Sequence, residues 1–231
     1  IESVGDLAKA GAAGLLKLDV LVYPDILSAR SAIKPPLLSR SYIDHVRIGG
    51  GKLTIDGSPQ GKTAWLTQPY LVPPAGRDKS YRGYPAIDPD QAKAAVDTAF
   101  ANNWQIICHA NGDAAADLFI AAVSAAAKKY GRADRRPVLI HAQVLREDQL
   151  DALKELGIIP SFFPMHTYYW GDWHRDSVLG PERAARISPT GSALRRGMRF
   201  TTHHDAPVAN PDSMRVLSAT VTRRTRSGAI L

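Results

Sequence analysis

The stretch "LIHAQV", residues 139–144, ends a short apolar run at a histidine, His141. The residues before it have the character of a buried strand, and a polar, helix-like segment follows. The same arrangement occurs in "IICHANGD", where the apolar run ends at His109, and in "FTTHHDAPV", where it ends at Asp205. Three predicted strands therefore end at a side chain that can bind a metal ion.

The composition is typical of one large α/β domain. The chain has 231 residues, of which 45% are hydrophobic and 22% are charged. No apolar run approaches the ~20 residues that cross a bilayer, and the opening "IESVGDLAKAG" lacks the segments of a signal peptide. The one cysteine, Cys108, excludes an intrachain disulfide and a cysteine-rich zinc site. These features favour a cytoplasmic protein without membrane association.

The net charge of +7 raises the alternative of a nucleic-acid-binding protein. The basic residues are dispersed, apart from residues 131–136 and 215–226, and no nucleic-acid-binding module is recognisable. A solvated basic surface explains the charge better, so no nucleic-acid partner is expected.

Short β-rich runs alternate with alanine-rich amphipathic runs along the chain. Strands are predicted at residues 17–24, 45–56, 104–110, 137–143, 158–164 and 198–205. Helices are predicted at residues 3–15, 25–32, 88–103, 113–131, 146–157, 189–197 and 212–225. Two long loops are expected after strands, at residues 57–85 and 165–183. This alternation predicts a parallel sheet.

The polar strand ends and both long loops follow the carboxyl ends of strands, as on the active-site face of a (β/α)8 TIM barrel. No GxGxxG or Walker sequence follows a predicted strand, which disfavours a nucleotide-binding doubly wound fold. Six strands are predicted, whereas a closed barrel has eight. We therefore expect residues 1–231 to form a single (β/α) barrel catalytic domain that is incomplete, with about strands three to eight.

His109, His141 and Asp205 are candidate metal ligands. Zinc and similar ions accept imidazole nitrogen and carboxylate oxygen, and a catalytic site keeps a position open for water. A histidine at a strand end is often only a structural hydrogen-bonding residue. Three such positions in successive βα units favour a shared site at the mouth of the barrel.

Five blocks of the sequence resemble the amidohydrolase superfamily. They are "GGGKLTIDGSPQGKTAWL", "CHANGDAAADL", "LIHAQVLREDQLDALKELGIIPSFFPMHT", "LGPERAARISP" and "HHDAPVANPDSMRVLSATVTRRT". The resemblance is greatest to amidohydrolase family 3, which includes N-substituted formamide deformylases, and it runs from about residue 45 to the C-terminus. The superfamily hydrolyses many amides, ureas and cyclic C–N bonds, so the resemblance leaves the substrate open.

The resemblance implies a barrel that binds one or two divalent metals, usually zinc. Lys52 matches a strand-four lysine that is carboxylated in binuclear members and bridges both metals; the alternative is an ordinary lysine at the barrel mouth. His109 matches the strand-five ligand and His141 the strand-six ligand. Asp205 matches the strand-eight aspartate, which contacts the metal and acts as general base and then acid.

One part of the family pattern is missing from this sequence. Strand one of the family carries a His-x-His pair, and no such pair occurs here. His203 and His204 are adjacent, so their side chains should point to opposite faces of a strand, and they belong to the strand-eight block. We expect the first two βα units and the flanking β-sandwich to lie outside these residues.

The second long loop contains His166, Tyr168 and Trp170, and the first contains Gln68. Aromatic and polar side chains in alternation suit the wall of a pocket for an apolar substrate group. These four residues are therefore candidate substrate-binding residues. The alternative is that they pack the loops onto the rim of the barrel.

The leading hypothesis is a metal-dependent amidohydrolase that cleaves a carbon–nitrogen bond other than a peptide bond, by metal-activated water. Its expected partner is a small-molecule amide-type substrate, such as an N-substituted formamide, and a homo-oligomer stays open. The alternative is a catalytically inactive fragment or a regulatory relative with the same scaffold.

Overall fold

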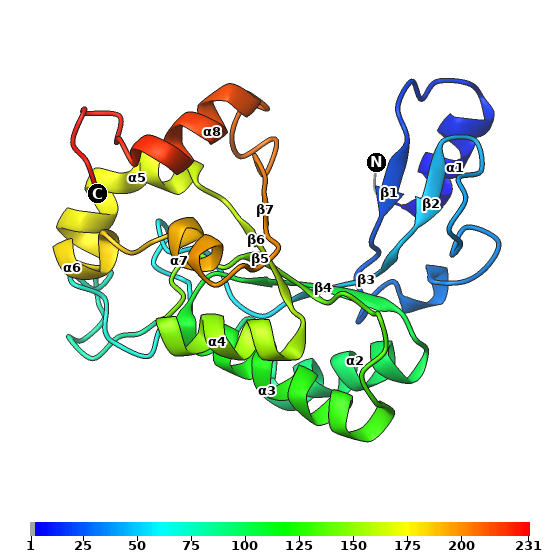
Figure 1. The fold of residues 1–231 in the computed structure, drawn as a ribbon, viewed down its shortest axis with the longest axis horizontal. Helices are drawn as coiled ribbons and strands as arrows, with labels where there is room; N and C mark the ends of the chain where they lie inside the picture. The colour runs from blue at the N-terminus through cyan, green and yellow to red at the C-terminus, as the bar shows by residue number, and fades with distance from the viewer. Residues whose placement is uncertain (1–2) are drawn as a thin grey trace.

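A parallel five-stranded sheet forms the centre of the molecule (Figure 1). The computed structural model describes residues 3–231. Strands adjacent in the sheet are also consecutive in sequence, and each pairing is parallel. The order is β3 (Gly50–Thr54), β4 (Gln105–Ala110), β5 (Val138–His141), β6 (Ile159–Phe162) and β7 (Thr201–Thr202).

A second parallel pair, β1 (Val20–Val22) and β2 (Val46–Ile48), continues this sheet. Pro24 follows β1, and its carbonyl accepts a hydrogen bond at 2.8 Å from the amide of Lys52 in β3. The chain segment that begins with β1 therefore pairs first with β2 and then with β3. The predicted strand at 45–56 is interrupted between these two strands. A Cβ on Gly50 would lie 1.9 Å from the carbonyl oxygen of Gln105, so only glycine fits this close approach.

Six parallel segments thus run side by side in chain order, as a partial barrel requires. The predicted α/β class with a parallel sheet is confirmed. Within residues 3–231 no strand pairing connects β7 to β1, so the sheet is open between them. None of the helices in this part of the chain is long and apolar enough to cross a membrane.

Three helices cover one face of the sheet (Figure 1). A row of paired residues on this face, Leu53, Cys108 and Leu139, is fully buried. These side chains belong to one apolar cluster with residues of the covering helices. The alternate residues along the strands therefore point to the opposite face, which includes Lys52 and His109. The covering helices are α2 (Pro89–Ala101), α3 (Asp113–Tyr130) and α4 (Glu147–Leu156).

Several helix ends are encoded locally. The side chain of Ser3 accepts a hydrogen bond from the Asp6 amide at the start of α1 (Val4–Ala12). Asp88 caps α2 in the same way, and α4 ends at Gly157 in the left-handed conformation. The helix predicted at residues 25–32 is only a short 3-10 turn, η1 (Arg30–Ala32).

The prediction of a loop at residues 165–183 is wrong. This segment contains α5 (Met165–Trp173), a π-helical turn η2 (His174–Val178) and α6 (Pro181–Ala184). Aromatic side chains of α5 pack with Val216 and Ala219 of α8 (Ser213–Thr222), so tertiary packing stabilises a helix that the local sequence does not indicate. The remaining helix is α7 (Thr190–Arg195).

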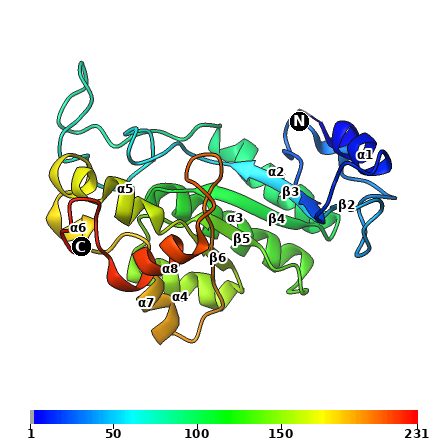
Figure 2. The ribbon, with the colours of Figure 1, turned by 90° about the horizontal axis from the view of Figure 1, so that it is seen from above.

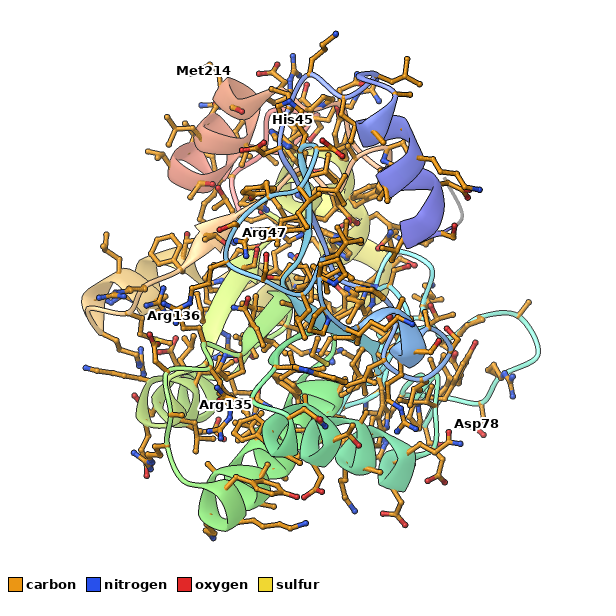
Figure 3. The ribbon with its side chains drawn as sticks, turned by 90° about the vertical axis from the view of Figure 1, so that its right-hand side faces the viewer. His45, Arg47, Asp78, Arg135, Arg136 and Met214 are labelled. Atoms are coloured by element: carbon orange, nitrogen blue, oxygen red, sulfur yellow. The ribbon has the colours of Figure 1, made fainter. Side chains whose placement is uncertain are left out.

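The first predicted loop contains no helix or strand between Gly57 and Pro85, as expected. Its tip, which carries Asp78, extends away from the body of the molecule (Figures 2 and 3). Lys62 connects the base of this loop to η2, because its ammonium donates to the Val72 carbonyl at 2.8 Å and to the Ser177 hydroxyl at 2.9 Å.

Candidate metal centre

Three histidines from different strands meet at the carboxyl end of the sheet. His109 lies in β4, His141 ends β5, and His203 follows β7. The Nδ1 atom of His109 and the Nε2 atom of His141 are 2.9 Å apart. The Nδ1 atom of His141 and the Nε2 atom of His203 are 3.2 Å apart. Residues far apart in the sequence therefore form one continuous imidazole cluster.

The backbone at His141 explains how its side chain reaches this face. His109 pairs with Ile140, so strict alternation would place His141 on the opposite face, toward the helices. His141 has a φ of 72°, and this left-handed conformation breaks the alternation. Asp205 has a φ of 57°. Left-handed backbone at residues other than glycine costs free energy, and it is concentrated at functional sites.

Three side chains offer ligand atoms close enough to share one metal ion. One atom each from His141, His203 and Asp205 lie within 4.8 Å of one another. His203 is absent from the predicted set, because it was considered only together with His204. Its signal is the two-residue spacing from Asp205, since residues two apart in an extended segment share a face.

The imidazoles are held neutral, which leaves a lone pair for a metal. Burial lowers the pKa of His109 to about 4 and that of His203 to about 4. Burial also lowers the pKa of His141, and the charges of His109 and His203 lower it further. Metal ligands must be deprotonated to bind. The donor set of two neutral imidazoles and one carboxylate therefore fits a divalent ion such as zinc.

Lys52 lies on the same face of the sheet and close to the histidines. Its neighbour two residues on, Thr54, pairs with His109. Burial lowers the pKa of Lys52, while the nearby carboxylates of Asp205 and Asp25 oppose this effect. In return, the positive charge of Lys52 lowers the pKa of His141 and His203.

Asp205 is half-buried at the edge of the cluster. Burial raises the pKa of its carboxyl, and the Lys52 charge lowers it in part. A carboxylate with a raised pKa accepts a proton more readily than a fully solvated one. The structure thus places a proton-accepting group beside two potential metal ligands.

Asp56 holds the start of the first loop against this edge of the sheet. Its carboxylate accepts hydrogen bonds from the amides of Trp65 at 2.9 Å, Asn111 at 2.9 Å and Gly112 at 2.8 Å. Burial raises its pKa to about 7, although these three amides oppose the shift. The loop carbonyl of Gly57 in turn lies 3.2 Å from the Nε2 atom of His109.

The four predicted substrate-binding residues are not brought to one place. His166 is only 2% exposed and pairs with His174, and the Trp170 ring packs on it. Tyr168 packs at the surface, where its hydroxyl accepts a hydrogen bond from Arg215 at 2.8 Å.

Gln68 lines a separate cavity of about 260 Å³ with Asp113, Arg146 and Arg183. Among residues 3–231, no hydrogen bond joins Gln68 or Tyr168 to the three histidines. Only His166 and Trp170 are connected to the cluster, through the ring of Phe163.

A sequence profile of the amidohydrolase family matches residues 10–231. Amidohydrolase YtcJ of Bacillus subtilis (strain 168) is 27% identical over 78% of this chain and 32% of its own length. The Arabidopsis thaliana protein LONG AFTER FAR-RED 3 is 29% identical over 76% of this chain and 29% of its own length. This chain thus spans about a third of the length of these curated relatives.

Two solved structures are similar over nearly the whole chain. An uncharacterized metal-dependent hydrolase from Pyrococcus furiosus has a TM-score of 0.78 and 26% identity, over 95% of this chain and 44% of that one. An uncharacterized metal-dependent hydrolase from Pyrococcus horikoshii OT3 has a TM-score of 0.77 at 23% identity, over 95% of this chain and 42% of that one. The second similarity concerns the fold alone.

Proposed function

The chain belongs to the amidohydrolase family, and on that premise we propose that it is a metal-dependent hydrolase of an amide-type carbon–nitrogen bond. The proposed substrates are N-substituted formamides. They belong to a wider class of compounds with carbon–nitrogen bonds other than peptide bonds. The observation that carries the proposal is the group formed by His141, His203 and Asp205, whose ligand atoms lie within 4.8 Å of one another.

His141, His203 and Asp205 would hold the metal, which we propose to be zinc. A divalent metal supplies a Lewis acid there and lowers the pKa of bound water toward ~7. His109 lies against His141 and would contribute a further nitrogen. The neutral state of these imidazoles supports the assignment.

Lys52 is proposed as a further ligand, in the carboxylated form. Only an uncharged amine reacts with CO₂, and burial lowers the pKa of Lys52 toward that form. The product, a carbamate, would turn a cation into an anionic oxygen ligand beside the histidines.

Asp205 would move the proton during hydrolysis. Its carboxylate can accept a proton from the attacking water and then return it to the leaving amine. The raised pKa of Asp205 suits both steps, because it brings the carboxyl closer to neutral pH.

The alternative is an inactive or regulatory relative with the same scaffold, in which the group of His141, His203 and Asp205 holds no metal.

Metal content and hydrolysis separate the two functions. We expect near-stoichiometric zinc by elemental analysis and hydrolysis of N-benzylformamide by the full-length protein. His141→Asn and His203→Asn should each lower zinc content. The matched control is His45→Asn, because the His45 side chain is exposed and pairs with Asp19 at 2.9 Å, outside the donor group formed by His141, His203 and Asp205. Absence of bound zinc in the presence of excess zinc would favour the inactive relative.

A further inference from the structure

A buried serine lies beside His203 on the face of the sheet that carries the donor group. Ser161 belongs to β6 and is 9% exposed. It pairs with Ile140 of β5, which in turn pairs with His109 of β4. Residues paired in this way share one face of a sheet. The hydroxyl of Ser161 therefore points to the side of the candidate metal centre.

The two nitrogens of the His203 ring face different neighbours. The Nδ1 atom lies 3.1 Å from the Oγ atom of Ser161, and the Nε2 atom lies 3.2 Å from the Nδ1 atom of His141. Two nitrogen ligands of one tetrahedral zinc ion lie about 3.3–3.4 Å apart, because each Zn–N bond is about 2.0–2.1 Å long. Nε2 is thus the nitrogen that His203 offers to a metal shared with His141.

Two contacts fix the His203 ring in this position. The Phe163 ring stacks on it, with a centroid distance of 5.3 Å and an angle of 18° between the planes. Stacking holds the plane of the imidazole, but it does not distinguish a nitrogen from a carbon within that plane. A half-turn of the ring would replace Nδ1 by a carbon atom, which cannot take part in the hydrogen bond to Ser161. This hydrogen bond therefore opposes the half-turn and keeps Nε2 beside His141.

The hydroxyl of Ser161 has another partner besides His203. The Thr201 hydroxyl donates to it at 2.8 Å, and Thr201 is the residue of β7 that pairs with Ser161. A buried hydroxyl needs at least one partner, and Thr201 already meets this need. The Oγ atom has two lone pairs, so it can also accept a hydrogen bond from His203. The contact with His203 thus serves the imidazole rather than the strand.

We propose that Ser161 is a positioning residue, which accepts a hydrogen bond from the Nδ1–H group of His203 and so keeps the lone pair of Nε2 directed toward His141. The inference rests on the proposed function, because it takes His203 as a metal ligand. A histidine that binds a metal through one nitrogen almost always donates the N–H group of the other nitrogen to a nearby oxygen. Ser161 supplies this oxygen from the neighbouring strand.

The affinity of the full-length protein for zinc, measured by competition with a chelator, tests the proposal. Ser161→Ala should weaken zinc binding by roughly 10–100-fold, the usual effect of removing such a partner. Ser161→Thr should bind zinc nearly as the wild type does, because it keeps the hydroxyl and its β-branch suits a strand. The matched control is Thr201→Val, which removes the other hydrogen bond of Ser161 and should leave zinc affinity unchanged. Zinc binding by Ser161→Ala at the wild-type affinity overturns the proposal.

The tautomer of His203 is an independent measurement. Long-range ¹H–¹⁵N correlation spectra of the zinc-loaded protein, labelled at histidine, distinguish Nδ1–H from Nε2–H, and His203→Asn identifies the signals. We expect an Nδ1–H group at His203 in the wild type and in Thr201→Val. In Ser161→Ala this proton should exchange with solvent faster, because its acceptor is lost. An Nε2–H group at His203, or equal exchange in Ser161→Ala, contradicts the proposal.

Kinetics on N-benzylformamide separate this inference from the proposed reaction. Ser161→Ala should be slower than the wild type at limiting zinc, and its kcat should return to the wild-type value at saturating zinc, because Ser161 acts through His203. A kcat that stays low at saturating zinc contradicts a role confined to positioning.

The two proposals can therefore fail separately. Weaker zinc binding in Ser161→Ala, without hydrolysis by any variant, would reject the reaction and keep the role of Ser161. Hydrolysis by the wild type, with unchanged zinc affinity in Ser161→Ala, would reject the role of Ser161 and keep the reaction. A wild-type protein that binds no zinc would reject both.

Discussion

At the residue scale, the donor group depends on the left-handed backbone of His141 and Asp205. The φ of 72° turns the His141 side chain to the face that carries His109, and Asp205, with a φ of 57°, offers a ligand atom to the same group. Asparagine tolerates this conformation better than most residues, whereas β-branched residues do not. Asparagine is therefore the replacement that removes each function with the least change in the backbone.

The two asparagine variants should differ in their response to zinc. Asp205→Asn should lower hydrolysis by roughly 10²–10⁴-fold, because an amide cannot accept the proton from water. Excess zinc should not restore this activity. His141→Asn should lose activity through weaker metal binding, and excess zinc should restore part of it.

The rate of hydrolysis against zinc concentration, with bound metal quantified in parallel, tests this contrast. Turnover at the wild-type level in Asp205→Asn at saturating zinc would remove Asp205 from the proposed mechanism.

The buried histidines should make the fold sensitive to acid. The pKa of His174 in the folded chain is about 3, below its ordinary value of 6.5, so protons bind the unfolded chain more strongly. Its stabilising contribution is complete above pH 6.5 and is lost as the pH falls from 6.5 toward 3.

Urea unfolding of His174→Gln between about pH 5.5 and about pH 4 measures this effect. The slope of unfolding free energy against pH should be shallower than in the wild type by up to about 1.4 kcal/mol per pH unit. Equal slopes would show that His174 is protonated equally in both states.

At the scale of the elements, the periodicity of the sequence predicted most of the fold correctly. Alternating burial within strands and the caps at Ser3, Asp88 and Gly157 are properties of neighbouring residues, so the sequence displays them. The helices α5 and α6 depend instead on packing between aromatic residues and α8, which no local pattern displays. The expected absence of the first two βα units stays a prediction.

The residues of the candidate site also fall into two groups: those that the sequence indicates and those that depend on tertiary structure. His109, His141 and Asp205 are recognisable because each ends a predicted strand, and the resemblance adds Lys52. His203 depends on the register of a strand only two residues long, and it was therefore missed. The burial of His166 against His174 follows from the unrecognised helical segment, so no sequence pattern indicated it.

The contacts of Lys62 should help to hold the first long loop in place. Its ammonium joins the loop to Ser177 and also lies 4.7 Å from the centroid of the Trp173 ring. Lys62→Met keeps much of the side-chain volume but removes the donor. The loop at residues 57–85 should then open more often, and limited trypsin digestion should cut at Arg77 or Lys79 faster than in the wild type.

The matched control for this experiment is Lys93→Met, because Lys93 is exposed on α2 and pairs only with Asp90 at 2.8 Å. Equal digestion rates for Lys62→Met and the wild type would show that the loop is held by its other contacts.

At the scale of the whole molecule, the candidate metal centre connects the interior of the sheet to its weakest edge. His141 ends β5, whereas His203 and Asp205 follow β7, which is the open edge of the sheet (Figure 1). The pairing of β7 with β6 covers only two residue pairs. A ligand bound to the folded state alone stabilises it by about 2.7 kcal/mol at a hundred times its dissociation constant.

Zinc should therefore stabilise the end of the chain more than the helices α2 and α3. Hydrogen exchange followed by mass spectrometry should show slower exchange at residues 199–222 when zinc is added, and His203→Asn should remove this effect. Unchanged exchange in this segment, with zinc bound, would place the metal elsewhere.

The single cysteine allows the rate at which the core opens to be measured. Cys108 lies in the middle of the sheet, fully buried under the helices, and burial raises the pKa of its thiol. A thiol-specific reagent can react only when this layer separates, because an inaccessible, protonated thiol is inert. No second thiol in the chain contributes a background signal. The labelling rate of the unmodified protein thus reports how often its core is exposed to solvent.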